Sequence, residues 1–174
     1  MSIASDKIKV ITPPNFELIP NDKFWNLSLF LGGSIEMDKA EQWQQRFIDG
    51  LRNKMNSKIH GVLKNIYIFN PRRANWDITV KQSITDPVFY QQVNWELDYL
   101  EKVEYRVFYF AENTLSPVSL LEYGKFFDYE NTYIAAHPNY NRIGNLQIFC
   151  HRHGIRLHQS VDDLVTIISP KTYF

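Results

Sequence analysis

Two glutamates stand where a carboxylate can take part in catalysis. Glu122 lies in the stretch LLEYG (residues 120–124), at the opening of a helix that follows a strand and a loop. Helix N-terminal amides and low polarity can hold an ionised carboxylate at such a place. The alternative is a glutamate that only balances the helix dipole, which is the commoner case in an arbitrary protein.

Glu96 is the second candidate, within Trp95-Glu96-Leu97. It falls close to the apolar stripe of a predicted helix, where burying a carboxylate costs free energy unless something uses the charge. The alternatives are that Glu96 reaches solvent or pairs with Arg72 or Arg73.

A polar loop after a predicted strand supplies candidate binding groups: Asn70, Arg72, Arg73 and Trp76. Two guanidinium groups there can form bidentate hydrogen bonds to a carboxylate or a phosphate. The alternative is that they tie the loop to acidic residues, and we expect a structural role for at least one. Trp76 can stack on a flat base or can pack as a lid on its own domain.

A glycine pair in Gly32-Gly33-Ser34 ends another apolar run and lets a ligand approach the backbone closely. The alternative is a tight strand-to-helix turn, since neither GxGxxG nor a P-loop motif occurs. The five histidines form no HExxH motif and no CxxC motif occurs, so we expect no metal.

These residues depend on alternating strands and helices for their positions. The hydrophobic pattern predicts strands at 7–12, 26–31, 65–69, 105–111, 132–136 and 155–158, and helices at 38–56, from 87, around 120–126, at 143–153 and at 161–168. The first of these strands is expected at an edge, within an N-terminal arm of residues 1–25. Such alternation predicts an α/β fold with a mostly parallel sheet and helices on both faces. Ligands bind beyond the carboxyl ends of such strands.

Composition narrows the class of partner. The 174 residues predict a single domain, and 19 basic against 19 acidic side chains leave no net charge to attract nucleic acid or a membrane surface. A small molecule is the expected partner. The N-terminus lacks the apolar run of a signal peptide and Cys150 is the one cysteine, so we expect a cytoplasmic protein. No apolar run reaches the ~20 residues that span a bilayer.

Four segments, in this order and at this spacing, resemble the nucleoside 2-deoxyribosyltransferase-like family. They are FLGGSIE (30–36), NPRR (70–73), WEL (95–97), and SP (116–117) with LLEYG (120–124). The resemblance covers roughly residues 26–140. It implies a flavodoxin-like (Rossmann-like) five-stranded mostly parallel sheet, homo-oligomers, and no cofactor. It also implies that Glu122 is the nucleophile, that Glu96 holds the base or exchanges protons with it, and that Gly33 and Ser34 shape the pocket.

Two departures from the family pattern bear on the substrate. The best-known transferases carry an aspartate that contacts the sugar where this chain has Ser116. Serine at this position resembles instead the deoxynucleoside monophosphate N-glycosidases, in which the hydroxyl helps to bind phosphate. Tyr123 replaces the commoner leucine after the nucleophile and leaves the carboxylate in place.

The sequence therefore predicts a nucleoside 2-deoxyribosyltransferase that acts through a covalent deoxyribosyl-glutamate. Arg72 or Arg73 would hold a phosphate if the substrate were a nucleotide. A 2′-deoxynucleoside 5′-monophosphate N-glycosidase stays open as an alternative. So does a non-catalytic nucleotide-binding module that uses Arg72, Arg73 and Gly33, and so does an enzyme for nicotinamide or ADP-ribose glycosidic bonds.

Overall fold

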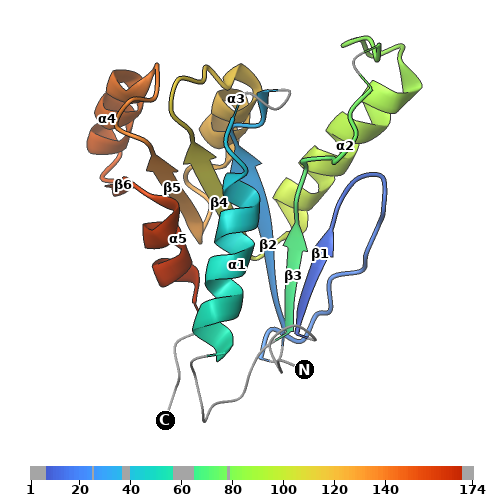
Figure 1. Ribbon diagram of the computed structural model, residues 1–174, viewed down its shortest axis with the longest axis horizontal. Coiled ribbons are helices and arrows are strands. Elements are labelled where there is room, and N and C mark those ends of the chain that lie inside the picture. Colours follow the sequence, from blue (N-terminus) through green and yellow to red (C-terminus); the bar gives the residue numbers. More distant parts are fainter. Residues whose placement is uncertain (1–6, 25, 37–39, 57–64, 78, 170–174) are drawn as a thin grey trace.

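A six-stranded parallel sheet forms the centre of the protein in the computed structural model, which describes residues 7–24, 26–36, 40–56, 65–77 and 79–169 (Figure 1). The strand order is β1-β3-β2-β4-β5-β6. The strands are β1 (Ile8–Ile11), β2 (Asn26–Gly33), β3 (Asn65–Phe69), β4 (Tyr105–Phe110), β5 (Thr132–Ala136) and β6 (Leu157–His158). The helices are α1 (Trp43–Asn56), α2 (Pro87–Lys102), α3 (Pro117–Phe126), α4 (Ile143–Arg152) and α5 (Val161–Ile168).

The predicted fold class is confirmed, and so is the strand predicted at an edge, which is β1; the five-strand count that the resemblance implies is wrong, because β1 belongs to the same sheet. Strands β2 to β6 have the flavodoxin-like order, and β1 adds a sixth strand at the edge. It pairs in parallel with β3, with Ile8 opposite Ile66. Ile8 and Ile11 are buried, whereas the two residues between them are exposed. The pairing of β1 with β3 therefore removes two isoleucine side chains from water.

The order of the strands reverses between β2 and β4. From β2 the chain crosses through α1 to β3 on one side, and then through α2 to β4 on the other side of β2. Ligands in open α/β sheets bind at such a switch point, beyond the carboxyl ends of the two strands. Here those ends are Gly33 of β2 and Phe110 of β4.

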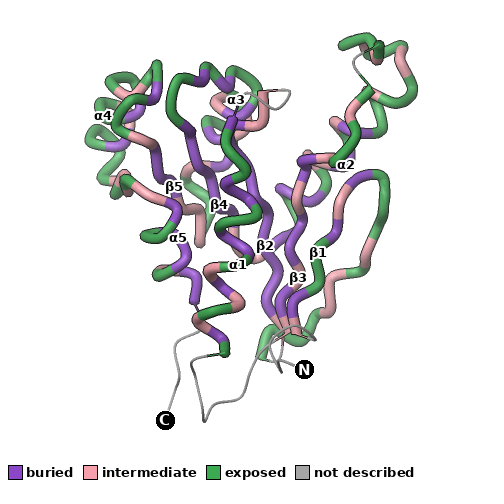
Figure 2. Tube along the Cα trace, viewed as in Figure 1, coloured by how far each residue is buried: buried purple, intermediate pink, exposed green. Residues whose placement is uncertain are grey.

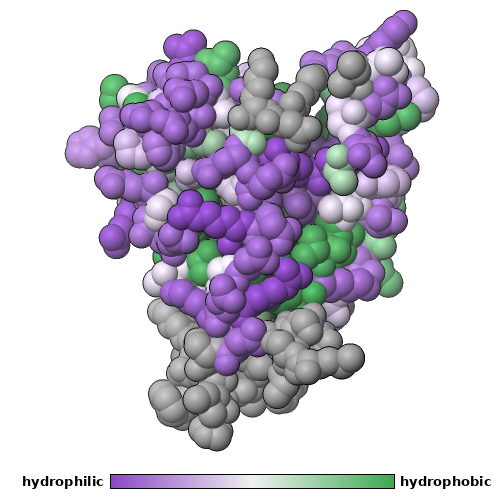
Figure 3. Space-filling model, in the orientation of Figure 1, coloured by the Kyte–Doolittle hydropathy of each residue, from purple (hydrophilic) through white to green (hydrophobic). Residues whose placement is uncertain are grey.

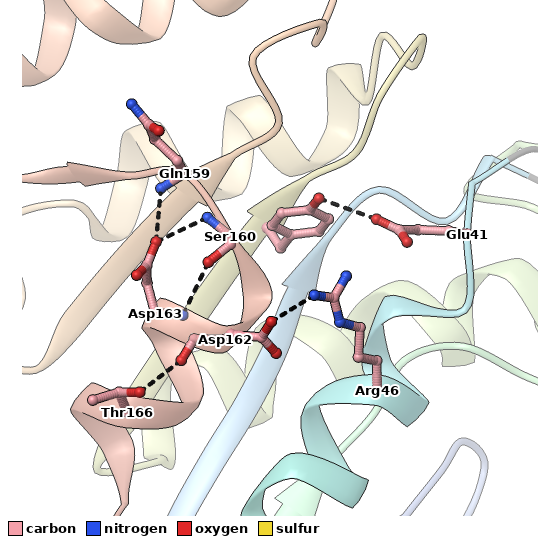
Figure 4. Close-up of polar contacts among 8 residues, drawn as sticks. Glu41, Arg46, Gln159, Ser160, Asp162, Asp163 and Thr166 are labelled. Carbon is pink, nitrogen blue, oxygen red and sulfur yellow. Dashed lines mark hydrogen bonds and ion pairs between the residues drawn. The ribbon is translucent and has the colours of Figure 1, made fainter.

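Helices cover both faces of the sheet (Figure 1). Buried residues of α1 and α5 form one core cluster with the sheet, and buried residues of α2, α3 and α4 form the other. The central strands are buried almost throughout (Figure 2). Arg46 of α1 donates to Asp162 of α5 at 2.7 Å and adds a surface ion pair between these helices (Figure 4). Polar residues cover the outward side of α1 (Figure 3), as expected for an amphipathic helix.

Helix α1 begins later than the sequence pattern predicts. We expect a start next to Asp38, which lies outside the described residues, whereas α1 starts at Trp43. Within the described part of the chain, none of the helices combines the length and the apolar content needed to cross a membrane.

The apolar face predicted for α2 is also partly wrong. We expect Val88, Phe89, Val93, Leu97 and Leu100 to face the core, but the buried residues are Gln92, Trp95, Tyr99 and Leu100. Val88 is 41% exposed because the first turns of α2 extend past the edge of the sheet (Figure 1). The periodicity alone does not show where the sheet ends.

Gly33 allows β2 to pass very close to β4. Its φ is 129°, and a Cβ on this residue would lie 2.0 Å from the carbonyl oxygen of Tyr109. That carbonyl also accepts a hydrogen bond from the amide of Ser34 at 2.9 Å, so it cannot move away freely.

We expect Gly33→Ala to lower the free energy of unfolding by about 2 kcal/mol or more, because it adds a clash and an unfavourable φ. Urea denaturation measures the change. Gly124→Ala is the matched control. Gly124 lies inside α3, and a Cβ added there would meet no atom within 4 Å outside its own stretch of helix. Alanine should therefore be neutral or stabilise the protein by up to about 1 kcal/mol. Equal stabilities for the two variants would contradict the close approach.

Candidate functional site

Helix α3 starts at the carboxyl edge of the sheet and is fastened to the end of β2. Ser119 donates its hydroxyl to the carbonyl oxygen of Gly33 at 2.8 Å. Pro117 occupies the first position, where a missing N–H costs nothing. Ser116 before it adopts the left-handed conformation, with φ 47° and ψ 52°. The helix therefore begins at the switch point.

Tyr123 fixes how α3 is rotated about its axis. Its ring is buried and packs edge-on against Phe108 at 5.4 Å and Phe149 at 5.9 Å. Its hydroxyl lies 3.7 Å from the sulfur of Cys150. The residue that departs from the family pattern thus anchors the helix, and Glu122 beside it lies at the margin of the buried face, partly exposed.

Glu122 carries a carboxyl group without a hydrogen bond or an ion pair among the described residues. Burial and the charge of Glu96 raise its pKa to about 8. Removal from water disfavours the charged form, and a nearby like charge disfavours it further. The helix therefore holds a carboxylate that is costly to ionise and that protein groups do not neutralise directly.

Glu96 is the electrostatic neighbour of Glu122 from helix α2. Gln92, one turn earlier, donates its amide to the Glu96 carboxylate at 2.5 Å and also to the carbonyl of Pro71 at 3.2 Å. Burial raises the pKa of Glu96 to about 7, while the Gln92 hydrogen bond and the charge of Arg73 oppose that rise. Gln92 is a positioning residue that sequence reasoning missed, although its place one turn before Glu96 is visible in the sequence.

The two adjacent arginines have different surroundings. Arg72 donates to the carbonyls of Ala40 and Glu41, at 3.1 and 2.9 Å, and holds the segment before α1. Its own amide donates to Asn70 Oδ1 at 3.0 Å, so Asn70 shapes this loop. These contacts match the structural role expected for at least one arginine.

Arg73 lies toward Glu96 instead. Its guanidinium group is 5.4 Å from the ring centroid of the partly exposed Trp76. Its Nε and Nη2 atoms are buried without a hydrogen-bond partner among the described residues, and burial lowers its pKa. Unsatisfied buried donors are rare in folded proteins and call for a functional or structural reason. Arg73 and Trp76 therefore belong with the Glu96 side of the site.

Ser34 and Ser116 meet in a buried cluster of hydroxyl groups. Their Oγ atoms are 2.7 Å apart, and Thr114 Oγ1 lies 2.8 Å from Ser34 Oγ. The amide of Ala111 also donates to Ser34 Oγ at 2.9 Å. Both serines were predicted to bind substrate; their hydroxyl groups fasten the β2 loop to the segment that precedes α3.

Glu36 is a site residue that the sequence prediction left out. Its Oε1 atom accepts hydrogen bonds from the amides of Leu115 and Ser116, the latter at 2.6 Å. The sequence did hold a hint of this role, because Glu36 ends the segment FLGGSIE, in a loop that follows a predicted strand and is expected to border the crevice. Its partners are about 80 residues further along the chain, which local patterns do not reveal.

A cavity of about 550 Å³ lies elsewhere, between the N-terminal arm and the end of α2. Its lining includes Ser28, near the start of β2, and Glu104, just before β4. These positions belong to the amino ends of the strands, opposite the edge where such sheets bind ligands. We therefore assign the site to the carboxyl edge. Within the described residues, no group of three or more His, Cys, Asp or Glu side chains could hold a metal ion.

The arrangement suits acid and nucleophile chemistry near neutral pH. Glu122 and Glu96 come from different helices, and their pKa values of about 8 and about 7 allow the pair to hold a single proton in this range. One carboxylate can then attack while the other donates a proton.

Comparison with known proteins adds one match. The sequence profile of a family described as nucleoside 2-deoxyribosyltransferase like matches residues 26–140. This range runs from the start of β2 past the end of β5 and contains Glu36, Glu96 and Glu122. The comparison with curated proteins found no match.

Proposed function

Because the chain belongs to the nucleoside 2-deoxyribosyltransferase-like family, we propose that it cleaves the N-glycosidic bond of a 2′-deoxynucleoside and transfers the sugar to another nucleobase. The observation that carries the proposal is the carboxyl group of Glu122, a half-buried residue at the carboxyl edge of the sheet. It has no hydrogen bond or ion pair among the described residues and lies in the field of a second carboxyl group, Glu96.

The proposed reaction is a double displacement. An oxygen of Glu122 attacks C1′ of the deoxyribose as the bond between C1′ and the base nitrogen breaks, which gives a deoxyribosyl ester of the enzyme. A nitrogen of a second base then attacks C1′ and releases the carboxylate. Because the sugar lacks an electron-withdrawing 2′-hydroxyl group, its oxocarbenium-like transition state is comparatively easy to reach.

Glu96 is the proposed proton donor to the leaving base. Its position on α2, with its carboxylate held by Gln92, keeps it oriented beside Glu122. Arg73 lies near Glu96, and the ring of Trp76 lies against Arg73. We therefore assign both to the base: a guanidinium group with unused donors and an aromatic face. Arg72 has a structural role in this proposal.

The second candidate is a hydrolase that releases the base from a deoxynucleoside 5′-monophosphate, with water as the acceptor. Ser116 favours it, because a serine at this position resembles the phosphate-binding serine of those enzymes. Against it, the Ser116 hydroxyl is already bonded to Ser34, and its amide to Glu36.

Incubation of a deoxynucleoside, or of its 5′-monophosphate, with a different free base separates the two candidates. We expect a new deoxynucleoside, identified by mass, whose formation requires the second base. Release of the base and of 2-deoxyribose 5-phosphate from the monophosphate, without an exchanged product, would indicate the hydrolase. Neither product from any deoxynucleoside or its monophosphate would contradict glycosidic cleavage altogether.

A further inference from the structure

The peptide group between Leu115 and Ser116 is held from both ends. The hydroxyl of Tyr140 donates to the Leu115 carbonyl oxygen at 2.8 Å, and Glu36 accepts from the Ser116 amide. Tyr140 is buried, and burial together with the charge of Glu36 raises its pKa to about 12, so it stays a donor. The carboxylate of Glu36 is thus held against this peptide group by hydrogen bonds.

This position has the features of an anion site that the protein fills with its own carboxylate. Two consecutive amides converge on one oxygen where the chain turns into α3, and converging amides at a helix start attract anions. The Ser116 side chain does not cap the helix, because its hydroxyl faces Ser34 and Thr114. Glu36, from the loop after β2, accepts instead from the two amides that precede the helix.

The position lies at the start of the helix that carries Glu122. Ser119 and Glu122 are one turn apart on α3, and Ser119 contacts the end of β2, from which the chain runs on to Glu36. Ser116 and Glu122 are about 9 Å apart along the helix axis at 1.5 Å per residue, and helical side chains lean toward the helix start. In the proposed complex the base lies at Glu96 and C1′ at Glu122, and the 5′ end of the sugar then points toward Glu36.

We propose that Glu36 selects the substrate by its 5′ substituent. It accepts a hydrogen bond from the 5′-hydroxyl group of a deoxynucleoside and excludes the 5′-phosphate of a deoxynucleotide. A phosphate at this place would meet a carboxylate that already occupies both amides, and like charges in contact repel strongly. This inference rests on the proposed function and names its substrate class, the uncharged deoxynucleoside.

The test compares kcat/KM for a deoxynucleoside and for its 5′-monophosphate. We expect the wild-type protein to favour the deoxynucleoside, and Glu36→Gln to reduce that preference by about tenfold or more, because the amide keeps an acceptor oxygen but carries no charge. Glu112→Gln is the matched control. Glu112 lies in the loop between β4 and α3, which supplies the two amides, but it is exposed and accepts a hydrogen bond from Asn139. Its loss should leave the preference unchanged.

Inorganic phosphate provides a measurement that does not need turnover. We expect phosphate to raise the melting temperature of Glu36→Ala, in which the two amides are vacated, more than that of the wild-type protein. If Glu36→Ala does not fold, Glu36→Gly serves for the same comparison, because glycine also vacates the two amides and tolerates the positive φ of this residue, 39°.

The outcomes separate this inference from the proposed function. Wild-type preference for the monophosphate, or a preference that Glu36→Gln leaves unchanged, would overturn the role of Glu36 while glycosidic cleavage stands. Absence of turnover with both substrates would count against the proposed function. The phosphate measurement then decides about Glu36 alone, and equal stabilisation of variant and wild type would reject it.

Discussion

Glu122→Gln is expected to lower kcat/KM for base exchange by at least about two to four orders of magnitude, the usual loss for an essential catalytic group. The amide keeps the size of the side chain but cannot form the covalent bond to C1′. Mass spectrometry of the wild-type protein with substrate alone should also detect a deoxyribosyl adduct, which the variant lacks. Glu130→Gln, an exposed change shortly after α3, is the control and should keep full activity.

Glu122→Gln should be at least as stable as the wild-type protein at alkaline pH. The folded state holds the pKa of Glu122 near 8, above the ordinary value of about 4.3 for an unfolded chain. Between these values the folded state binds more protons, so the wild-type protein loses stability as pH rises through this window. Glutamine removes that loss, and we expect a higher melting temperature for Glu122→Gln at pH above about 8. Near wild-type turnover by this folded variant would discard the mechanism.

Glu96→Gln is expected to lower kcat by about a hundredfold and to change the pH profile. For the wild-type protein we expect kcat/KM to rise as the pair loses its first proton near pH 7 and to fall as it loses the second near pH 8. In the free protein Glu96 is the stronger acid, so the form with Glu122 ionised is the minor one. A bound base that accepts a proton from Glu96 favours that form.

In Glu96→Gln the fall at high pH should disappear, because no proton donor is left to lose. The rise should not move to lower pH, because burial still raises the pKa of Glu122 and because Glu96 is uncharged when the wild-type pair loses its first proton. Glu96→Gln should lower kcat less for a substrate whose base is a better leaving group, such as 5-fluorouracil in place of uracil. Asp98→Asn, an exposed change on the same helix, is the control. An unaltered descending limb in Glu96→Gln would contradict the role of Glu96 as the acid.

Local pattern was enough to predict most of the elements. The predicted strand at 65–69 and the predicted helix at 161–168 match β3 and α5 residue for residue. Both are short stretches in which apolar residues recur at a regular spacing, and each is bounded by polar residues. The order of the motifs likewise pointed to the family that the profile match then showed.

Other features depended on which segments meet in space. Arg72 and Arg73 are neighbours in sequence, and successive side chains of an extended segment point to opposite sides. The helices on either side therefore decide that one arginine holds the loop before α1 and the other lies beside Glu96.

The sequence by itself determined the α/β alternation and the family, and it singled out Glu96 and Glu122 as candidates. The tertiary structure decided that Gln92 holds Glu96, that the edge strand β1 pairs with β3, and that Glu36 reaches amides about 80 residues away. The physical reason is that periodicity records which side of an element is buried, whereas contacts across the carboxyl edge depend on how the crossovers order the strands. Those contacts set the charge at the site, on which the proposed choice of a deoxynucleoside over a deoxynucleotide rests.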